Sequence, residues 1–296
     1  MKKNKFVKNL KIFSAVVILS VSSYNIGDIV SGTNEFHETI ESEQNFDDLG
    51  NYVLQGLCKV DDKYLLSAYD YSHNNKSILY ILNENLKFYR IKVLDSYSHV
   101  GGVTYDPKNE IVWVTDSDGW ITAYDKEEIL DDTKIETTKR PIYVGEELQN
   151  IFGDYSAAYI TYNDDKLYVG NFNFKHNNVI KEYDIEDDGL INPREYKKYK
   201  IGRFIQGITF YEDDNDKKYL IVSSSFGRHF NSELEIYDFN TLEKIKDIKT
   251  MEMMQEIIVD DDKLITIYES NAKTYKKNNS GKDIIISNID KILSKK

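Results

Sequence analysis

The chain has little cysteine, little proline and a deficit of positive charge. Its 296 residues include one Cys and three Pro, and 50 acidic residues oppose 38 Lys and Arg, which gives a formal net charge of −12. The single cysteine, Cys58, excludes an intramolecular disulfide, so the fold must depend on its apolar core. The acidic balance argues against a nucleic-acid partner, because phosphate recognition requires a basic surface.

Common catalytic and metal-binding motifs are also absent from the sequence. The chain has no Gly-x-Ser-x-Gly elbow, no His-Glu-x-x-His motif, no phosphate-binding glycine-rich loop and no pair of cysteines for zinc. These absences argue against the usual patterns of serine hydrolases, zinc proteases and P-loop enzymes.

The N-terminus has the pattern of a secretory signal peptide. Five lysines lie within residues 1–11, an apolar stretch follows at residues 12–21, and Ser22 and Ser23 come next. The stretch is about half as long as a membrane-crossing helix, which needs about 20 residues. We therefore predict a signal peptide over residues 1–23, with an uncleaved anchor as the alternative. The expected product is secreted or associated with the cell wall, without a membrane span after cleavage. The many Lys, Asn, Ile and Tyr residues suggest a Gram-positive bacterium.

Five segments of the chain repeat one plan. Each has a first strand, a short acidic turn, a second apolar strand, a polar loop and a third strand. Equivalent positions in the first strands are 56, 102, 159, 207 and 256, so the spacings are 46, 57, 48 and 49 residues. Short strands repeating at this interval are typical of β-propeller blades, and 23 Tyr with 13 Phe favour β-structure.

We therefore predict an all-β, five-bladed β-propeller over residues 47–296. Each blade exposes an apolar face that only its neighbours can cover, so the ring must close. The fifth copy stops soon after its third strand. Residues 24–46 are expected to supply the missing outer strand and close the ring, although they are poor in strand-forming residues.

Two local phrases resemble known propellers. The segments 99–106 (HVGGVTYD) and 206–210 (QGITF) are similar to blade phrases of secreted bacterial propellers. Residues 183–192 (YDIEDDGLIN) resemble a hairpin of gluconolactonase and regucalcin-like propellers. Those propellers usually have six blades, and their metal-binding Glu, Asn and Asp set has no match in this chain. The resemblance implies the fold and leaves the activity open.

Propeller geometry predicts where a site lies. The entries of the first strands and the loops after the second strands meet at one mouth of the central channel, and binding residues concentrate on such loops. The glycines after His99 are expected to open space there. The predicted ligand-binding set is His99, Gln55, Gln206, Gln255, Ser225 and Arg228. The alternative for the glutamines is repeated packing, and the alternative for His99 is a hydrogen bond to a neighbouring blade. For Arg228 the alternative is an ion pair with Asp or Glu.

The candidate catalytic residues come from the same mouth. They are His99, Asp116, Asp118 and Glu269; two of the carboxylates would form a glycosidase pair if their separation allowed it. Residues 54–57 (LQGL) also prompt comparison with five-bladed glutaminyl cyclases, although the remaining motifs of that family are not evident.

An acidic run suggests calcium. Asp184, Glu186, Asp188 and Glu195 fit the spacing of an EF-hand loop. No amphipathic helix precedes them, and an Asp-Gly hairpin turn accounts for the same residues. Both interpretations stay open.

These observations favour one functional hypothesis over another. The first is an exported propeller that binds a small ligand, a glycan or a protein partner at the channel mouth. The alternative is a hydrolase or lyase that acts on a sugar or lactone in the channel and uses calcium or no cofactor.

Overall fold

The computed structural model describes residues 33–131, 138–145, 156–173, 176–275 and 281–294. The predicted signal peptide and residues 24–32 lie outside these ranges. Among the described helices, none combines the length and the apolar character that crossing a membrane requires.

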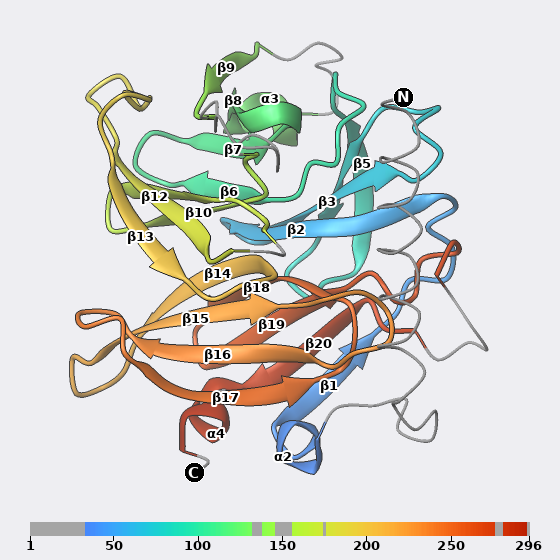
Figure 1. Ribbon diagram of the computed structural model, residues 1–296. Helices are drawn as coiled ribbons and strands as arrows, with labels where there is room; N and C mark the ends of the chain where they lie inside the picture. The colour runs from blue at the N-terminus through green and yellow to red at the C-terminus, as the bar shows by residue number, and fades with distance from the viewer. Residues whose placement is uncertain (1–32, 132–137, 146–155, 174–175, 276–280, 295–296) are drawn as a thin grey trace, which may run out of the picture. The chain divides into compact units, whose positions relative to one another are not determined.

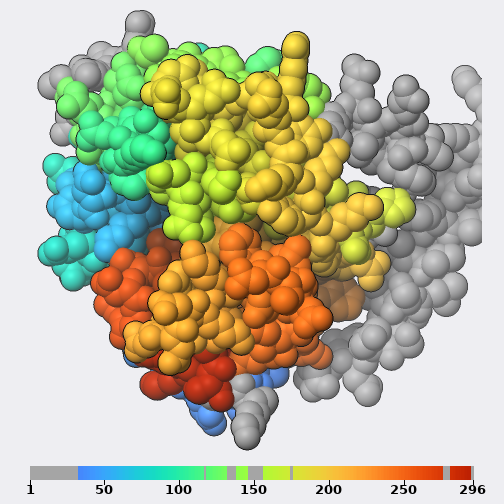
Figure 2. All heavy atoms as spheres, turned by 90° about the vertical axis from the view of Figure 1, so that its left-hand side faces the viewer, coloured from blue at the N-terminus to red at the C-terminus, as the bar shows by residue number. Residues whose placement is uncertain are grey.

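The described strands form five four-stranded antiparallel sheets arranged in a ring, which confirms the predicted five-bladed β-propeller. In Figure 2 the colours follow one another around the face from blue through green and yellow to orange and red, which is the chain order of the blades. Blade 1 is β2 (Tyr52–Val60), β3 (Lys63–Asp70), β4 (Ile78–Leu82) and β5 (Phe88–Val93); blade 2 is β6 (Val103–Asp106), β7 (Ile111–Thr115), β8 (Trp120–Asp125) and β9 (Arg140–Tyr143); blade 3 is β10 (Tyr159–Asn163), β11 (Lys166–Gly170), β12 (Asn178–Asp184) and β13 (Lys197–Ile201); blade 4 is β14 (Ile205–Glu212), β15 (Lys218–Ser224), β16 (Ser232–Asp238) and β17 (Lys244–Thr250).

The fifth blade contains strands from both ends of the described chain. Strands β18 (Met254–Asp260), β19 (Lys263–Tyr268) and β20 (Ile284–Asn288) come from the C-terminal part, and β1 (Ile40–Gln44) pairs antiparallel with β20 as the outermost strand. The middle of β1, Glu41 to Glu43, is exposed. Short helices are α2 (Asn34–His37), α3 (Lys126–Leu130), α4 (Ile289–Ser294) and the 3-10 turn η1 (Ser117–Gly119).

The apolar core lies between the blades. It consists of five clusters, and each combines residues of two neighbouring blades. Leu65 of blade 1 and Val112 of blade 2 belong to one cluster, and Ile221 of blade 4 and Ile257 of blade 5 belong to another. Burial of each such side chain contributes about 1.5–3 kcal/mol. Most of this stabilisation requires the neighbouring blade, so the ring is the folding unit.

Glycines bring the innermost strands into close contact around the ring axis. A Cβ on Gly102 would lie 2.7 Å from the backbone nitrogen of Ile160, and one on Gly101 would lie 2.1 Å from the carbonyl oxygen of Ala158. A Cβ on Gly207 would lie 2.0 Å from Oε1 of Glu256. The expectation that Gly101 and Gly102 open space is therefore wrong, because backbone of the next blade fills that space.

Candidate functional site

Three glutamines at equivalent positions lie in irregularities of the innermost strands. The pairing of β2 with β3 shifts between Leu54 and Leu57, so Gln55 and Gly56 face one residue of β3. The same kind of shift occurs at Gln206 in β14 and at Gln255 in β18. A β-bulge of this kind re-aims a side chain and is common beside functional sites. The recurrence of Gln in the sequence thus corresponds to a recurrent backbone feature.

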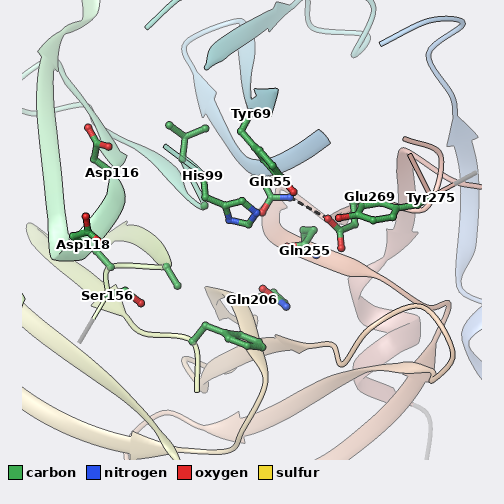
Figure 3. Close-up of a pocket in the computed structure, with 15 residues that line it drawn as sticks. Gln55, Tyr69, His99, Asp116, Asp118, Ser156, Gln206, Gln255, Glu269 and Tyr275 are labelled. Atoms are coloured by element: carbon green, nitrogen blue, oxygen red, sulfur yellow. Dashed lines mark hydrogen bonds between the residues drawn. The ribbon is translucent and has the colours of Figure 1, made fainter. Parts of the chain in front are cut away.

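The three glutamines line a pocket of about 380 Å³ on the ring axis, and all five blades contribute to its wall. Blade 5 supplies Glu269 and Tyr275 on one side, and blade 2 supplies Asp116 and Asp118 on the other (Figure 3). The remaining described lining residues are Tyr69, His99, Val100, Gly101, Ser156, Ala157, Ala158 and Phe172. The predicted convergence of strand entries and loops at one mouth is therefore present in the structure.

The glutamines differ in their hydrogen bonds. Nε2 of Gln55 donates to the carbonyl of Leu54 at 2.7 Å and to Oε2 of Glu269 at 3.3 Å. Nε2 of Gln206 donates to the carbonyl of Ser225 at 3.4 Å. The side chain of Gln255 is 5% exposed and has no hydrogen-bond partner among the described residues. Its amide donors and its acceptor oxygen are therefore available to the pocket.

Glu269 has the properties of a proton donor or acceptor. It follows β19, and its backbone N–H donates to the carbonyl of Met253 at 3.1 Å, which fixes the start of the loop. Burial raises the pKa of its carboxyl to about 7, although the hydrogen bond from Gln55 and the charge of Arg228 act in the opposite direction. The side chain is therefore close to half ionised at neutral pH.

His99 faces the pocket as a neutral ring. Its centroid lies 4.1 Å from that of Tyr69, with the rings tilted by 52°. The residue is exposed toward the pocket, while the part of the ring that packs on Tyr69 is removed from water. This desolvation, with a smaller contribution from His73, lowers the pKa of His99 to about 4. At neutral pH the imidazole is therefore a hydrogen-bonding group without charge.

The two aspartates lie in the loop between β7 and β8. Asp116 accepts a hydrogen bond from the hydroxyl of Ser96 at 2.9 Å, and its own backbone N–H donates to the carbonyl of Trp120 at 2.8 Å. Asp118 is exposed and adopts a left-handed backbone with φ of 57°. Both carboxylates reach the pocket from the side opposite Glu269 (Figure 3).

Ser225 and Arg228 lie near the pocket but are not part of its wall. Ser225 is buried, its hydroxyl accepts a hydrogen bond from Ser232 at 3.0 Å, and its carbonyl accepts the one from Gln206. Arg228 is exposed, and its guanidinium carbon lies 5.1 Å from the ring centroid of Tyr275. Ser225 therefore supports Gln206, and Arg228 lies against the ring of Tyr275.

A second carboxyl lies next to Gln255 in β18. Glu256 is 1% exposed, and its Oε1 accepts the backbone N–H of Ile257 at 3.1 Å, while Oε2 has no partner among the described residues. Burial raises the pKa of this carboxyl well above its usual range. The side chain fills the space beside Gly207.

The acidic run after β12 forms a hairpin turn. Ile185 bridges to Ile191, Gly189 has a φ of 78°, and its N–H donates to the carbonyl of Glu186 at 2.9 Å. Asp184 forms an ion pair with Lys166. Within the described part of the chain, no group of three or more His, Cys, Asp or Glu is arranged to hold a metal ion; this includes Asp184, Glu186, Asp188 and Glu195.

Tyr275 is the pocket residue that sequence reasoning missed. Its hydroxyl is hydrogen-bonded to that of Tyr69, and burial raises the pKa of Tyr69. Tyr275 follows β19 by seven residues, in a long loop whose path the repeat pattern does not determine. Its only signal in the sequence is an aromatic residue in a loop on the pocket side.

Comparisons with known proteins support the fold. No protein-family model and no curated protein matched the chain. Among solved structures, the chain is similar to glutaminyl cyclase from Myxococcus xanthus, with a TM-score of 0.50 and 11% identity over 80% of this chain and 92% of that one. A chain of a nidogen/laminin complex has a TM-score of 0.45 and 12% identity over 75% of this chain and 78% of its own. At such low identity, the similarity to the cyclase concerns the β-propeller fold alone.

Proposed function

We propose that the protein binds a small polar ligand in the pocket on the ring axis. The amide of Gln255 carries this proposal, because it is buried, lines the pocket and lacks a partner among the described residues. The amide atoms of Gln255 are not among the buried polar atoms that lack a partner, so water in the pocket reaches them, and packing alone gives no reason for an amide at this place. A ligand that hydrogen-bonds to Gln255 takes the place of that water.

The form of the pocket also supports binding of a small molecule. A volume of about 380 Å³ falls within the range of pockets that hold small ligands. Its three amides are held on the inner strands and its carboxylates on the loops after β7 and β19. Tyr69, Phe172 and Tyr275 provide aromatic walls. Such rings also suit a sugar, so the terminal unit of a glycan belongs to the candidate ligands.

A ligand panel with a matched variant tests this proposal. Sugars, lactones, amines and amino acids are titrated by calorimetry and by thermal shift, since a ligand of the native state raises the melting temperature with concentration. Gln255→Leu should weaken binding at least tenfold, which corresponds to about 1.4 kcal/mol. Glu84→Gln, at an exposed loop position, should bind as the parent protein does. If no class of compound binds, the proposal is wrong and a macromolecular partner is the next hypothesis.

Catalysis is a second candidate function, and the raised pKa of Glu269 favours it. A carboxyl with a pKa of about 7 is suited to general acid–base catalysis near neutral pH. Asp116 and Asp118 on the opposite wall supply a second carboxylate for hydrolysis or elimination on a sugar or lactone.

Turnover assays distinguish catalysis from binding alone. Lactones, aryl glycosides and a peptide with N-terminal glutamine, the last prompted by the cyclase neighbour, are offered as substrates. Glu269→Gln should lower kcat by about 10²–10⁴-fold while ligand still binds. Turnover that survives this substitution contradicts the assigned role of Glu269. The paired change of Asp116 and Asp118 to Asn then tests the opposite wall.

We also propose that this function is extracellular, since residues 1–23 have the pattern of a signal peptide. N-terminal sequencing of protein recovered from culture medium and from cell wall tests this. A mature chain that begins near Tyr24 supports cleavage, whereas one that retains Met1 contradicts it.

A further inference from the structure

The described wall of the pocket is acidic. Asp116, Asp118 and Glu269 line it, and no lysine or arginine is among the described lining residues. His99, the one histidine in this wall, is uncharged at neutral pH because its pKa is about 4. An anionic ligand would therefore meet two or three carboxylates without a cation in the described wall to offset them.

Aromatic faces add to the attraction for a cation. Tyr69, Phe172 and Tyr275 line the same pocket, and an aromatic ring attracts a cation that lies over its face. Tyr275 already has such a neighbour, because the guanidinium carbon of Arg228 lies 5.1 Å from its ring centroid. The electrostatic effect of Arg228 on Glu269 is smaller than that of burial.

Uncharged acceptors complete the recognition of a cation. Oε1 of Gln55 accepts no hydrogen bond from a described residue, and the carbonyl of the Gln255 amide is also without a donor. Ammonium groups require acceptors on several sides, and these amide oxygens lie on the same wall as Glu269 (Figure 3). The buried, unpartnered amide of Gln255 is evidence for a ligand that does not depend on the carboxylates.

We propose that the ligand of this pocket is a small organic cation, bound through an ammonium group between the carboxylates and the aromatic faces. This inference rests on the proposed ligand-binding function and specifies its chemistry. Neutral sugars would hydrogen-bond to the amides and the carboxylates but would not offset the negative charge of the carboxylates. Small carboxylic acids would be repelled.

Matched compounds that differ only in charge test the proposal. Choline and its uncharged carbon isostere 3,3-dimethyl-1-butanol have nearly the same shape, and ethanolamine, ethylene glycol and glycolate form a second set. Calorimetric titration of the full chain should show binding of choline or ethanolamine, with the neutral analogues at least about fivefold weaker and glycolate not bound. Equal binding of a cation and its isostere overturns the proposal.

Variants separate the pocket from the general negative charge of the protein. Asp116→Asn preserves the acceptor for Ser96 and should weaken choline binding at least about fivefold. Glu84→Gln removes one exposed charge outside the pocket and should leave binding unchanged. If both variants weaken binding equally, the attraction is non-specific and the proposal fails. If only sugars or lactones bind, the ligand is not a cation but the pocket still binds a small molecule; if no compound binds, the proposed function fails as well.

Discussion

Gln55 and Gln255 offer a sharp test, because they occupy bulges in two blades and differ in their hydrogen bonds. Gln55→Leu removes the bonds to the Leu54 carbonyl and to Glu269, and each bond contributes about 0.5–1.5 kcal/mol, or more where one partner is charged. The expected loss in the free energy of unfolding is about 1–3 kcal/mol. Gln255→Leu removes no hydrogen bond to a described residue and replaces a buried amide with an alkyl group of similar size. The unfolding free energy should stay unchanged or rise by about 1 kcal/mol.

Urea unfolding monitored by tryptophan fluorescence measures both variants under the same conditions. If the free energy of unfolding falls with urea concentration at the same rate in both variants, a change in the midpoint of unfolding reports a change in stability. The two substitutions are identical and lie at equivalent bulges, so their difference isolates the hydrogen bonds. The same samples should show that Gln255→Leu has lost ligand binding, which is the pattern of a residue kept for function at no gain in stability. If Gln255→Leu destabilises the protein as much as Gln55→Leu, the amide has a structural role and the reasoning is refuted.

Three further predictions concern the pH profile, the close inner contacts and the closing strand. The pKa of Glu269 is about 7 in the folded protein, against an ordinary value of 4.5. Between these two pH values the folded state binds more protons than the unfolded state, so the free energy of unfolding should fall as pH rises through this interval. Glu269→Gln should remove up to about 3 kcal/mol of this fall, and calorimetric melts at pH 4, 6 and 8 that show no change in the pH dependence would disprove the assignment. Gly207→Ala should lower the free energy of unfolding by about 1–3 kcal/mol, because a Cβ would lie 2.0 Å from Oε1 of Glu256. Gly227 has a φ of 66° and no atom within 4 Å of an added Cβ, so Gly227→Ala should lower it by about 1 kcal/mol. Equal losses in chemical denaturation would contradict the close-contact argument. A chain beginning at Asn51 lacks β1 and leaves the outer edge of β20 unpaired, although β20 still pairs with β19. Calorimetry should show a melting temperature lower by several degrees, and an unchanged value would mean that closure by β1 adds no stability.

The blades were predictable because their information is local. Each repeat carries short apolar strands and an acidic turn, and the interblade clusters require only that apolar residues fill both faces of these strands. The outer strands of a blade tolerate charged residues, so their sequences are hard to distinguish from loops. The strand that contains Glu41 to Glu43 could therefore be expected only because the fifth repeat lacked a fourth strand to pair with β20. Composition alone gave no indication of it.

The pocket was predictable to the extent that it depends on the repeat. Gln55, Gln206 and Gln255 recur at one position, and the bulges place them at the axis. Residues on long loops follow no such rule, which explains why Tyr275 was missed and why Arg228 lies outside the wall. The spacing of acidic residues after β12 matched a calcium loop because the same Asp and Gly residues suit a tight turn.

Blade 5 combines strands from both ends of the described chain, so it can be completed only after β20 has been synthesised. Strand β1 leaves the ribosome early, but its partner β20 follows about 240 residues later, which at 5–20 residues per second is a delay of roughly 12–48 s. During this time β1 is a solitary strand with nothing to pair with. Its exposed Glu41 and Glu43 make it a poor template for pairing with another chain. The exposed glutamates that make β1 hard to recognise as a strand in the sequence therefore also protect it from pairing with other chains until β20 has been synthesised.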